Sequence, residues 1–185
     1  MGDIDGDSDI DAVGKIWGQG LVTLINQGTG ELLPSWKLED QQTTIGDIAL
    51  AGFDQDGDLD ALICNGFRET GSYPCRLLWN DGNGQFTESG LNLPSTMGAH
   101  IAVGDLDLDG DLDVVVTNMG RLNQIWLYED ARFIDSGLRL GIESEMSGRP
   151  TLGDLDGDGD LDLIIGRFRG GAEIWFNLTK HPENP

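Results

Sequence analysis

The sequence has little basic charge, few cysteines and prolines, and no long apolar run. It carries 11 Lys and Arg against 33 Asp and Glu, for a formal net charge of −22. Without a basic patch to neutralise phosphates, the chain is not expected to bind nucleic acid or anionic membranes. No apolar run approaches the roughly 20 residues that span a bilayer as a helix, so membrane insertion is not expected either.

Helical periodicity is also missing. The best helical candidate, residues 138–146, is short and is interrupted by Gly141. The 28 glycines instead separate short apolar runs, a pattern typical of an all-β chain. Met1 leads directly into an acidic string without a signal peptide, so we expect the chain to be a fragment.

The most informative feature that is present is an acidic string that occurs four times. Each copy places Asp on alternate residues and then runs into apolar β-forming residues. The copies lie at residues 2–14, 52–63, 104–116 and 153–166. Their last Asp residues recur at intervals of 49, 53 and 49 residues, and a period near 50 predicts a repeat architecture.

Most of the negative charge belongs to these strings. They hold 19 of the 33 acidic residues, and the rest of the chain carries a net charge of only −3. Carboxylates packed this densely repel one another unless cations lie among them. The strings therefore predict local cation binding rather than a disordered acidic tail.

The spacing of the carboxylates indicates the cation. If Asp154 is position one, then positions one, three, five and nine are Asp, and a backbone carbonyl at position seven completes an all-oxygen cage. Such ligands suit calcium best; magnesium prefers a more rigid octahedron, and zinc prefers His or Cys. We predict up to four calcium ions, one for each string. The candidate ligands are Asp3, Asp5, Asp7, Asp9, Asp11, Asp54, Asp56, Asp58, Asp60, Asp105, Asp107, Asp109, Asp111, Asp113, Asp154, Asp156, Asp158, Asp160 and Asp162.

Three further positions of the string have expected roles. Position seven is expected to contribute backbone oxygen rather than its carboxylate. Position six needs a positive φ at the sharp turn, which glycine permits and which Ser8 adopts less comfortably in the first copy. Position eight is apolar in all copies and is expected to point into the core. Its residues are Ile10, Leu59, Leu112 and Leu161.

The copies are not equal. In the second, position one is Gly52, so we expect weaker binding there or a water in place of the carboxylate. The first copy lies at the chain terminus without a preceding strand to brace it. Two alternatives remain for all four: an EF-hand loop, which would need Glu at position twelve and flanking helices, and acidic turns that hold no metal.

Each repeat is expected to form four strands, with the acidic string between the first and second. In the second and third repeats we predict fourth strands at residues 85–88 and 132–134. Trp79, Trp126 and Trp175 are expected at matching places on the third strands, packed between repeats, with six extra residues in the hairpin before Trp79.

Four-stranded units of this period are typical of β-propeller blades. We predict one all-β propeller domain or arc over residues 1–185, with two complete and two partial blades. The approximate repeats are 1–40, 41–95, 96–145 and 146–180, followed by a tail at 181–185. The first lacks strand one and the last lacks strand four, so the chain either closes imperfectly or needs a second copy in a homodimer to complete a larger ring.

The strings, together with the segment LLWNDGNGQF at 77–86, closely resemble FG-GAP and VCBS-type repeats, the calcium-binding blades of integrin α-subunit heads and many bacterial surface proteins. The resemblance covers nearly the whole chain. It implies a propeller with structural calcium and an adhesive or scaffolding role outside the cell, at the cell surface or in the periplasm. It leaves the protein or glycan ligand unspecified.

Cys64 and Cys75 flank a hairpin of the second repeat, and facing positions across a hairpin suit a disulfide. Asn177-Leu178-Thr179 is a glycosylation sequon. No catalytic group is recognisable, so we expect a non-enzymatic interaction module. The alternatives are a lectin, with Phe67 or Tyr73 stacking on sugar, and a part of a larger propeller or propeller-containing enzyme such as a lyase.

Overall fold

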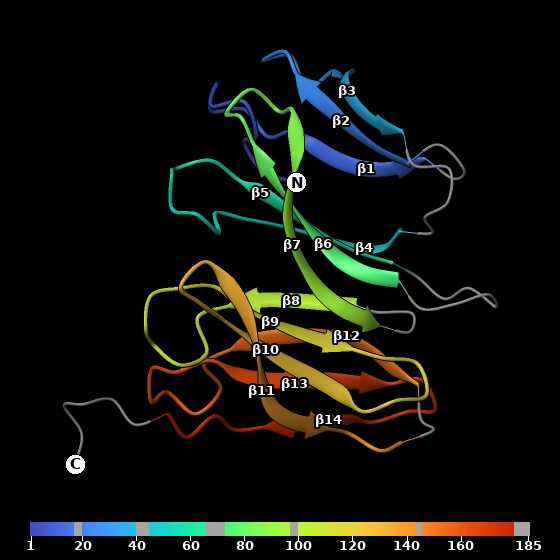
Figure 1. The fold of residues 1–185 in the computed structure, drawn as a ribbon, viewed down its shortest axis with the longest axis vertical. Coiled ribbons are helices and arrows are strands. Elements are labelled where there is room, and N and C mark those ends of the chain that lie inside the picture. The colour runs from blue at the N-terminus through green and yellow to red at the C-terminus, as the bar shows by residue number, and fades with distance from the viewer. Residues whose placement is uncertain (17–19, 40–44, 66–72, 97–99, 144–145, 180–185) are drawn as a thin grey trace. The chain divides into compact units, whose positions relative to one another are not determined.

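The computed structural model describes residues 1–16, 20–39, 45–65, 73–96, 100–143 and 146–179 (Figure 1). These residues form 14 β-strands in four antiparallel sheets, and no helix occurs among them. The all-β class is therefore confirmed. Within this part of the chain there is accordingly no helix that is long and apolar enough to cross a membrane.

Each sheet is a meander in which neighbours along the chain are hydrogen-bonded neighbours in space. The first sheet is β1 (Ala12–Ile16), β2 (Gly20–Asn26) and β3 (Leu32–Glu39). The second is β4 (Ile45–Ala51), β5 (Asp60–Asn65), β6 (Tyr73–Asn80) and β7 (Phe86–Thr96). The third is β8 (His100–Gly104), β9 (Asp113–Thr117), β10 (Asn123–Glu129) and β11 (Arg132–Leu140), and the fourth is β12 (Ser147–Gly153), β13 (Asp162–Arg167) and β14 (Ala172–Trp175).

The strand numbers agree with two complete and two partial repeats. The middle sheets have four strands and the outer two have three. The assignment of these sheets as propeller blades, and the number of blades in a ring, stays a prediction.

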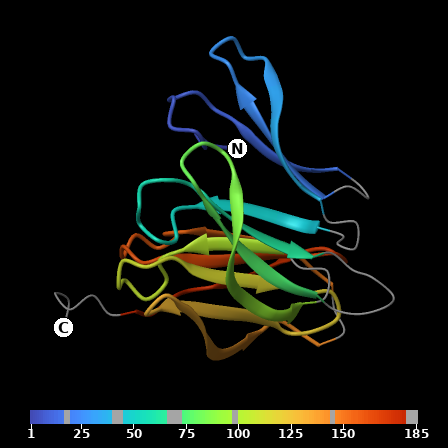
Figure 2. The same ribbon diagram turned by 45° about the horizontal axis from the view of Figure 1, so that its top comes forward.

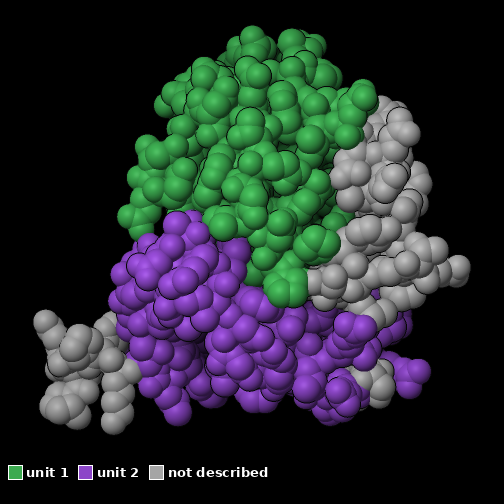
Figure 3. Space-filling model, in the orientation of Figure 1, with its two compact units in different colours: residues 1–96 green, residues 97–185 purple. Residues whose placement is uncertain are grey.

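The chain divides into two compact units, coloured separately in Figure 3. Unit 1 is Met1–Thr96 and holds the first two sheets; unit 2 is Met97–Pro185 and holds the other two. Each unit has its own core. In unit 1, Leu21 of β2 packs with Ile63 of β5 and Phe86 of β7. In unit 2, Val115 of β9 packs with Leu163 and Ile165 of β13.

The fourth strands are much longer than predicted. They run over Phe86–Thr96 and Arg132–Leu140, beyond the expected ends at 88 and 134. The reason is a bulge at Gly90 and Gly137, with φ of 81° and 78°, which breaks the alternation that marks a strand in sequence.

The predicted alignment of Trp79 with Trp126 and Trp175 is wrong by one residue in the second sheet. Leu163 pairs with Trp175 and Val114 with Trp126, each directly after the last Asp of a string. The same position in β5, Ala61, pairs with Leu78 rather than Trp79. The extra residues before this strand therefore number five, not six, and sequence alignment of the aromatics misplaced them.

A disulfide joins Cys64 of β5 to Cys75 of β6, with Cα atoms 4.1 Å apart. Ile63 and Arg76, the next residues along, are paired across the same two strands. The predicted bond across the hairpin is thus present in the structure.

Candidate metal centres

Each acidic string forms a tight loop at the start of a sheet. We call residues 3–11, 52–60, 105–113 and 154–162 loops 1 to 4, and number their residues one to nine. Loops 2, 3 and 4 connect the first and second strands of their sheets. Loop 1 has no such strand among the described residues, but hydrogen bonds between Gly2 and Asp11 close its base. In unit 2, loops 3 and 4 lie side by side at one end of the sheets (Figures 1 and 2).

The Asp at position nine is the structural centre of every loop. Its side chain is at most 1% exposed. One carboxylate oxygen accepts the N–H of position two at 2.8–2.9 Å. The other oxygen accepts an N–H at 2.8–3.0 Å from a residue at or near the C-terminal end of β2, β6, β10 or β14. These four residues, which tie loop and sheet together, are Asp11, Asp60, Asp113 and Asp162.

The Asp at position one folds the turn itself. In loops 1, 3 and 4 its two oxygens accept the N–H groups of positions four and six at 2.7–3.2 Å. Loop 2 has Gly52 at this position and therefore lacks both bonds.

Two residues of each loop have left-handed backbone. Position six has φ between 74° and 104°, and Ser8 adopts it as expected. Position four is also left-handed in every loop, which the sequence analysis missed because Gln55 and Leu108 occupy it in loops 2 and 3. Residues other than glycine are strained in this left-handed conformation, so hydrogen bonds must hold the turn.

Three loops bring three carboxylates together. In each, one oxygen from positions one, three and nine lies within 4.8 Å of the others. The groups are Asp3, Asp5 and Asp11; Asp105, Asp107 and Asp113; and Asp154, Asp156 and Asp162. Loop 2, which the structure describes in full, has no such group, and Gly52 is the reason.

The remaining predicted ligands are not brought into these groups. At position five, Asp7, Asp109 and Asp158 each accept the N–H of position seven through Oδ1. Asp56 does the same in loop 2. At position seven, Asp160 is fully buried, and neither of its carboxylate oxygens has a hydrogen-bond partner.

Burial and mutual repulsion disfavour the ionised form of the loop carboxylates. Burial raises the pKa of Asp60 and of Asp113 to about 6, against two backbone N–H bonds that lower it. Burial and the neighbouring carboxylates also raise the pKa of Asp5, Asp107 and Asp156. Each loop is therefore short of positive charge.

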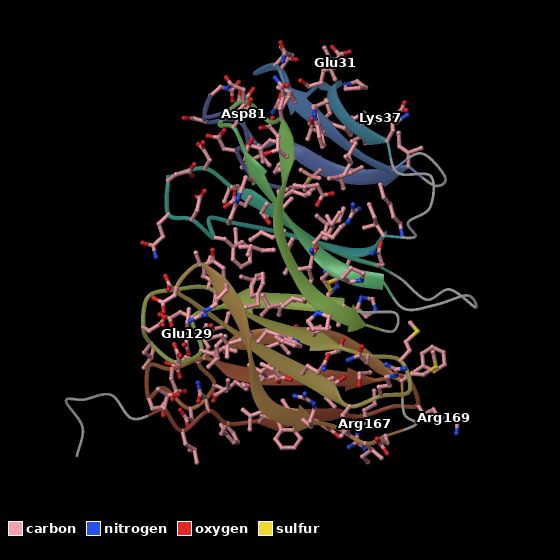
Figure 4. The ribbon with its side chains drawn as sticks, viewed as in Figure 1. Glu31, Lys37, Asp81, Glu129, Arg167 and Arg169 are labelled. Atoms are coloured by element: carbon pink, nitrogen blue, oxygen red, sulfur yellow. A yellow bond between two sulfur atoms is a disulfide. The ribbon has the colours of Figure 1, made fainter. Side chains whose placement is uncertain are left out.

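The described Lys and Arg side chains do not supply that charge. Among the residues that the structure describes, none of the nine grouped carboxylates forms a salt bridge. In unit 2, Arg167 and Arg169 lie at the end of the sheets opposite Glu129 and the acidic loops (Figure 4). Arg167 pairs there with Glu173.

The expected core position of residue eight holds only in part: Leu161 packs against the core of unit 2, but none of the four side chains is fully buried. Ile10 is 57% exposed, and the other three side chains are half-buried. Leu59 lies against Gly2 and Leu161 against Gly104, where a Cβ would come within 2.4 and 2.7 Å of the leucine methyl groups. Leu59 and Leu161 thus pack on the preceding repeat of their unit. Ile10 of loop 1 has no preceding repeat among the described residues.

One set of residues was missed by sequence reasoning. Asn80 Nδ2 donates to the carbonyl of Ile4 at 2.9 Å, and Asn177 Nδ2 donates to that of Leu106 at 2.7 Å. Each bond links a sheet to position two of the preceding loop in the same unit. The signal was the recurrence of Asn 15 residues after Asp11 and Asp162, which the longer second repeat hides. The sequon asparagine therefore has its amide engaged inside the fold.

An all-β chain of repeated antiparallel sheets, with an acidic loop in each repeat, belongs to the class of β-sheet repeat proteins. The chain matches the FG-GAP-like repeat family over residues 52–116 and 105–165. These matches span more than half of the chain, which therefore belongs to the FG-GAP-like repeat family. A comparison with curated proteins gave no match.

Proposed function

We propose that the chain is a calcium-stabilised module of propeller blades that serves protein interaction outside the cell. The observation that carries the proposal is three clusters of three carboxylates, whose oxygens lie within 4.8 Å of one another and which form no salt bridge among the described residues. Hard, all-oxygen ligands without His or Cys favour calcium over zinc.

The residues fit a divalent cation. Positions one, three and nine would hold it in loops 1, 3 and 4, and Asp107 Oδ1 is buried without a hydrogen-bond partner in loop 3. A bound cation would neutralise the loop and favour the ionised carboxylates. Loop 2 would bind more weakly or not at all.

The wider role rests on less specific support. The disulfide suits an oxidising compartment, such as the cell exterior or periplasm. Family membership supports a repeat module, which we propose to be non-enzymatic. The lectin alternative depended on Phe67, outside the described residues, and on the side chain of Tyr73, which is not described.

Calcium titration by calorimetry, paired with thermal melts, tests the proposal. We expect three sites and a higher Tm in calcium; a ligand at 100 times its Kd adds about 2.7 kcal/mol per site. Asp105→Asn should remove one site, whereas the matched variant Asp54→Asn in loop 2 should remove none. Equal Tm values with calcium and with chelator would contradict the proposal. Mass measurement in calcium tests the homodimer.

A further inference from the structure

The outer edge of β14 differs from the other third strands. In the first three repeats the strand equivalent to β14 (β2, β6 or β10) is covered by one further strand (β3, β7 or β11), whereas β14 is the last strand of its sheet (Figure 1). No described residue pairs with its outer edge. Its side chains are correspondingly exposed: Trp175 is 39% exposed and Ile174 is 55% exposed.

An apolar groove of about 640 Å³ lies next to this edge, wholly within unit 2. One wall is formed by Ile125, Leu127 and Leu138 of the third sheet, and the other by Leu163, Trp175 and Phe176. The groove continues directly into the buried interface between the two sheets, because Leu140 and Leu163 belong both to the groove and to the core of the unit.

Unit 1 shows what occupies the same place when a fourth strand is present. The N–H groups of Asn80 and Asn177 bind Asp60 and Asp162 in the same way, which aligns Leu78 with Trp175. Leu78 is 1% exposed, covered by β7.

The aromatic residue that starts β7 fills the corresponding space. Phe86 is 3% exposed, and its ring centroid lies 5.7 Å from that of Trp36. The strand registers align Trp36 with Leu138, which is 54% exposed in unit 2. The unit 2 groove is thus the space that the aromatic residue of a fourth strand fills in unit 1.

We propose that the groove and the outer edge of β14 bind an extended strand of a partner polypeptide, antiparallel to β14, with an aromatic side chain between Leu138 and Trp175. The proposal deepens the interaction role above and rests on it, but it does not depend on cation binding.

The chain's own fourth strands define the chemistry of the partner. Phe86–Leu93 and Phe133–Leu140 share the pattern Phe-x-acidic-Ser-Gly-Leu-x-Leu. The serine hydroxyls donate to third-strand carbonyls: Ser89 to Leu77 at 2.7 Å and Ser136 to Ile125 at 2.8 Å. The equivalent acceptor in β14 is the carbonyl of Ile174. Residues 178–185 do not carry the pattern.

The charge of the groove further limits which strands can bind. Asp107 is the one ionisable residue among the groove's described lining residues. A partner strand that is neutral or basic near Asp107 is therefore complementary to the groove, while an acidic residue near Asp107 would be repelled.

The probe is an acetylated and amidated peptide with the sequence Phe86–Leu93 and the change Glu88→Gln, which removes the acidic side chain that Asp107 would repel. It is titrated into the full chain by calorimetry and NMR, in calcium and in chelator. We expect saturable 1:1 binding, with shifts confined to β14 and the groove. A Phe86→Ala peptide should bind about 10-fold more weakly or worse, since it loses one buried aromatic side chain. On the protein, Trp175→Ala should weaken binding similarly, and the matched control Phe168→Ala, which alters a 78% exposed ring outside the groove, should not.

Three outcomes would overturn the proposal. One is no binding by a chain whose NMR spectrum is folded; another is equal binding of both peptides or by all variants. The third is a protein that is dimeric through this edge and is not dissociated by the peptide, which would make a second copy the occupant. A chain that binds the peptide but not calcium would refute only the cation proposal.

Discussion

The two units are built from the same repeat and differ in what holds them. Unit 1 has a disulfide, a closed interface between its sheets around Phe86 and Trp36, and one cluster of three carboxylates. Unit 2 has no cysteine, an open groove at β14 and two clusters of three carboxylates. The difference teaches that the repeat tolerates the loss of one support where another is present. We expect unit 1 to depend mainly on its bridge and packing, and unit 2 mainly on cations.

The largest expected effect tests what the units share. Asp60→Ala in unit 1 and Asp113→Ala in unit 2 each leave two buried N–H groups without an acceptor, which costs about 2–6 kcal/mol. Denaturant unfolding should show similar losses for both. Calcium titration should show one site fewer only for Asp113→Ala. A loss below about 1 kcal/mol in either variant would refute the central role of position nine.

The second prediction separates the units. The double variant Cys64→Ser, Cys75→Ser should destabilise unit 1 by about 2–4 kcal/mol, because the bridge no longer restricts the unfolded chain. Hydrogen exchange should report faster opening in β4 to β7. Unchanged exchange there, or an equal increase in β8 to β14, would contradict a stabilising role confined to unit 1.

A third prediction makes loop 2 more like the loops of unit 2. Gly52→Asp restores the carboxylate of position one, although its Cβ would lie 3.0 Å from the Asp58 carbonyl oxygen. Gly52→Ala carries the same steric cost and is the matched control. In calcium at 10 to 100 times Kd, the Asp variant should be more stable than the Ala variant by about 1–3 kcal/mol. No difference in calcium would mean that position one is not a ligand.

The smallest expected effect is the pH dependence of the calcium-free protein. The pKa values of Asp60 and Asp113, about 6, lie above the ordinary value of 3.8, so protonation favours the folded chain. That contribution is complete below about pH 4 and is lost as the pH rises through 6. In chelator the Tm should fall across this window, by about 2–4 °C for each kcal/mol of stability lost. Added calcium should raise Tm more at pH 7 than at pH 4.5; the opposite order would contradict cation binding.

The sequence predicted much of this architecture because its repeat signal is local. The all-β class, the position of every acidic loop, the left-handed turn at position six and the Cys64–Cys75 bond follow from spacing and turn chemistry. The errors arose where strands meet. The bulges at Gly90 and Gly137 hid the long fourth strands, and the extra hairpin residues shifted the tryptophan column by one.

The acidic string by itself determined which residues approach one another, since alternate carboxylates in a nine-residue loop cannot separate far. It also determined that loop 2 has one carboxylate fewer than the other loops, because Gly52 has no side chain; the structure added that the remaining carboxylates of loop 2 form no cluster of three. Only the tertiary structure decided that position nine is the buried anchor of each loop, since one of its two partners is a backbone N–H near the end of a different strand. The same is true of the groove at β14. The sequence predicted no fourth strand for residues 146–180, but only the packing of Phe86 on Trp36 in unit 1 showed what such a strand would fill.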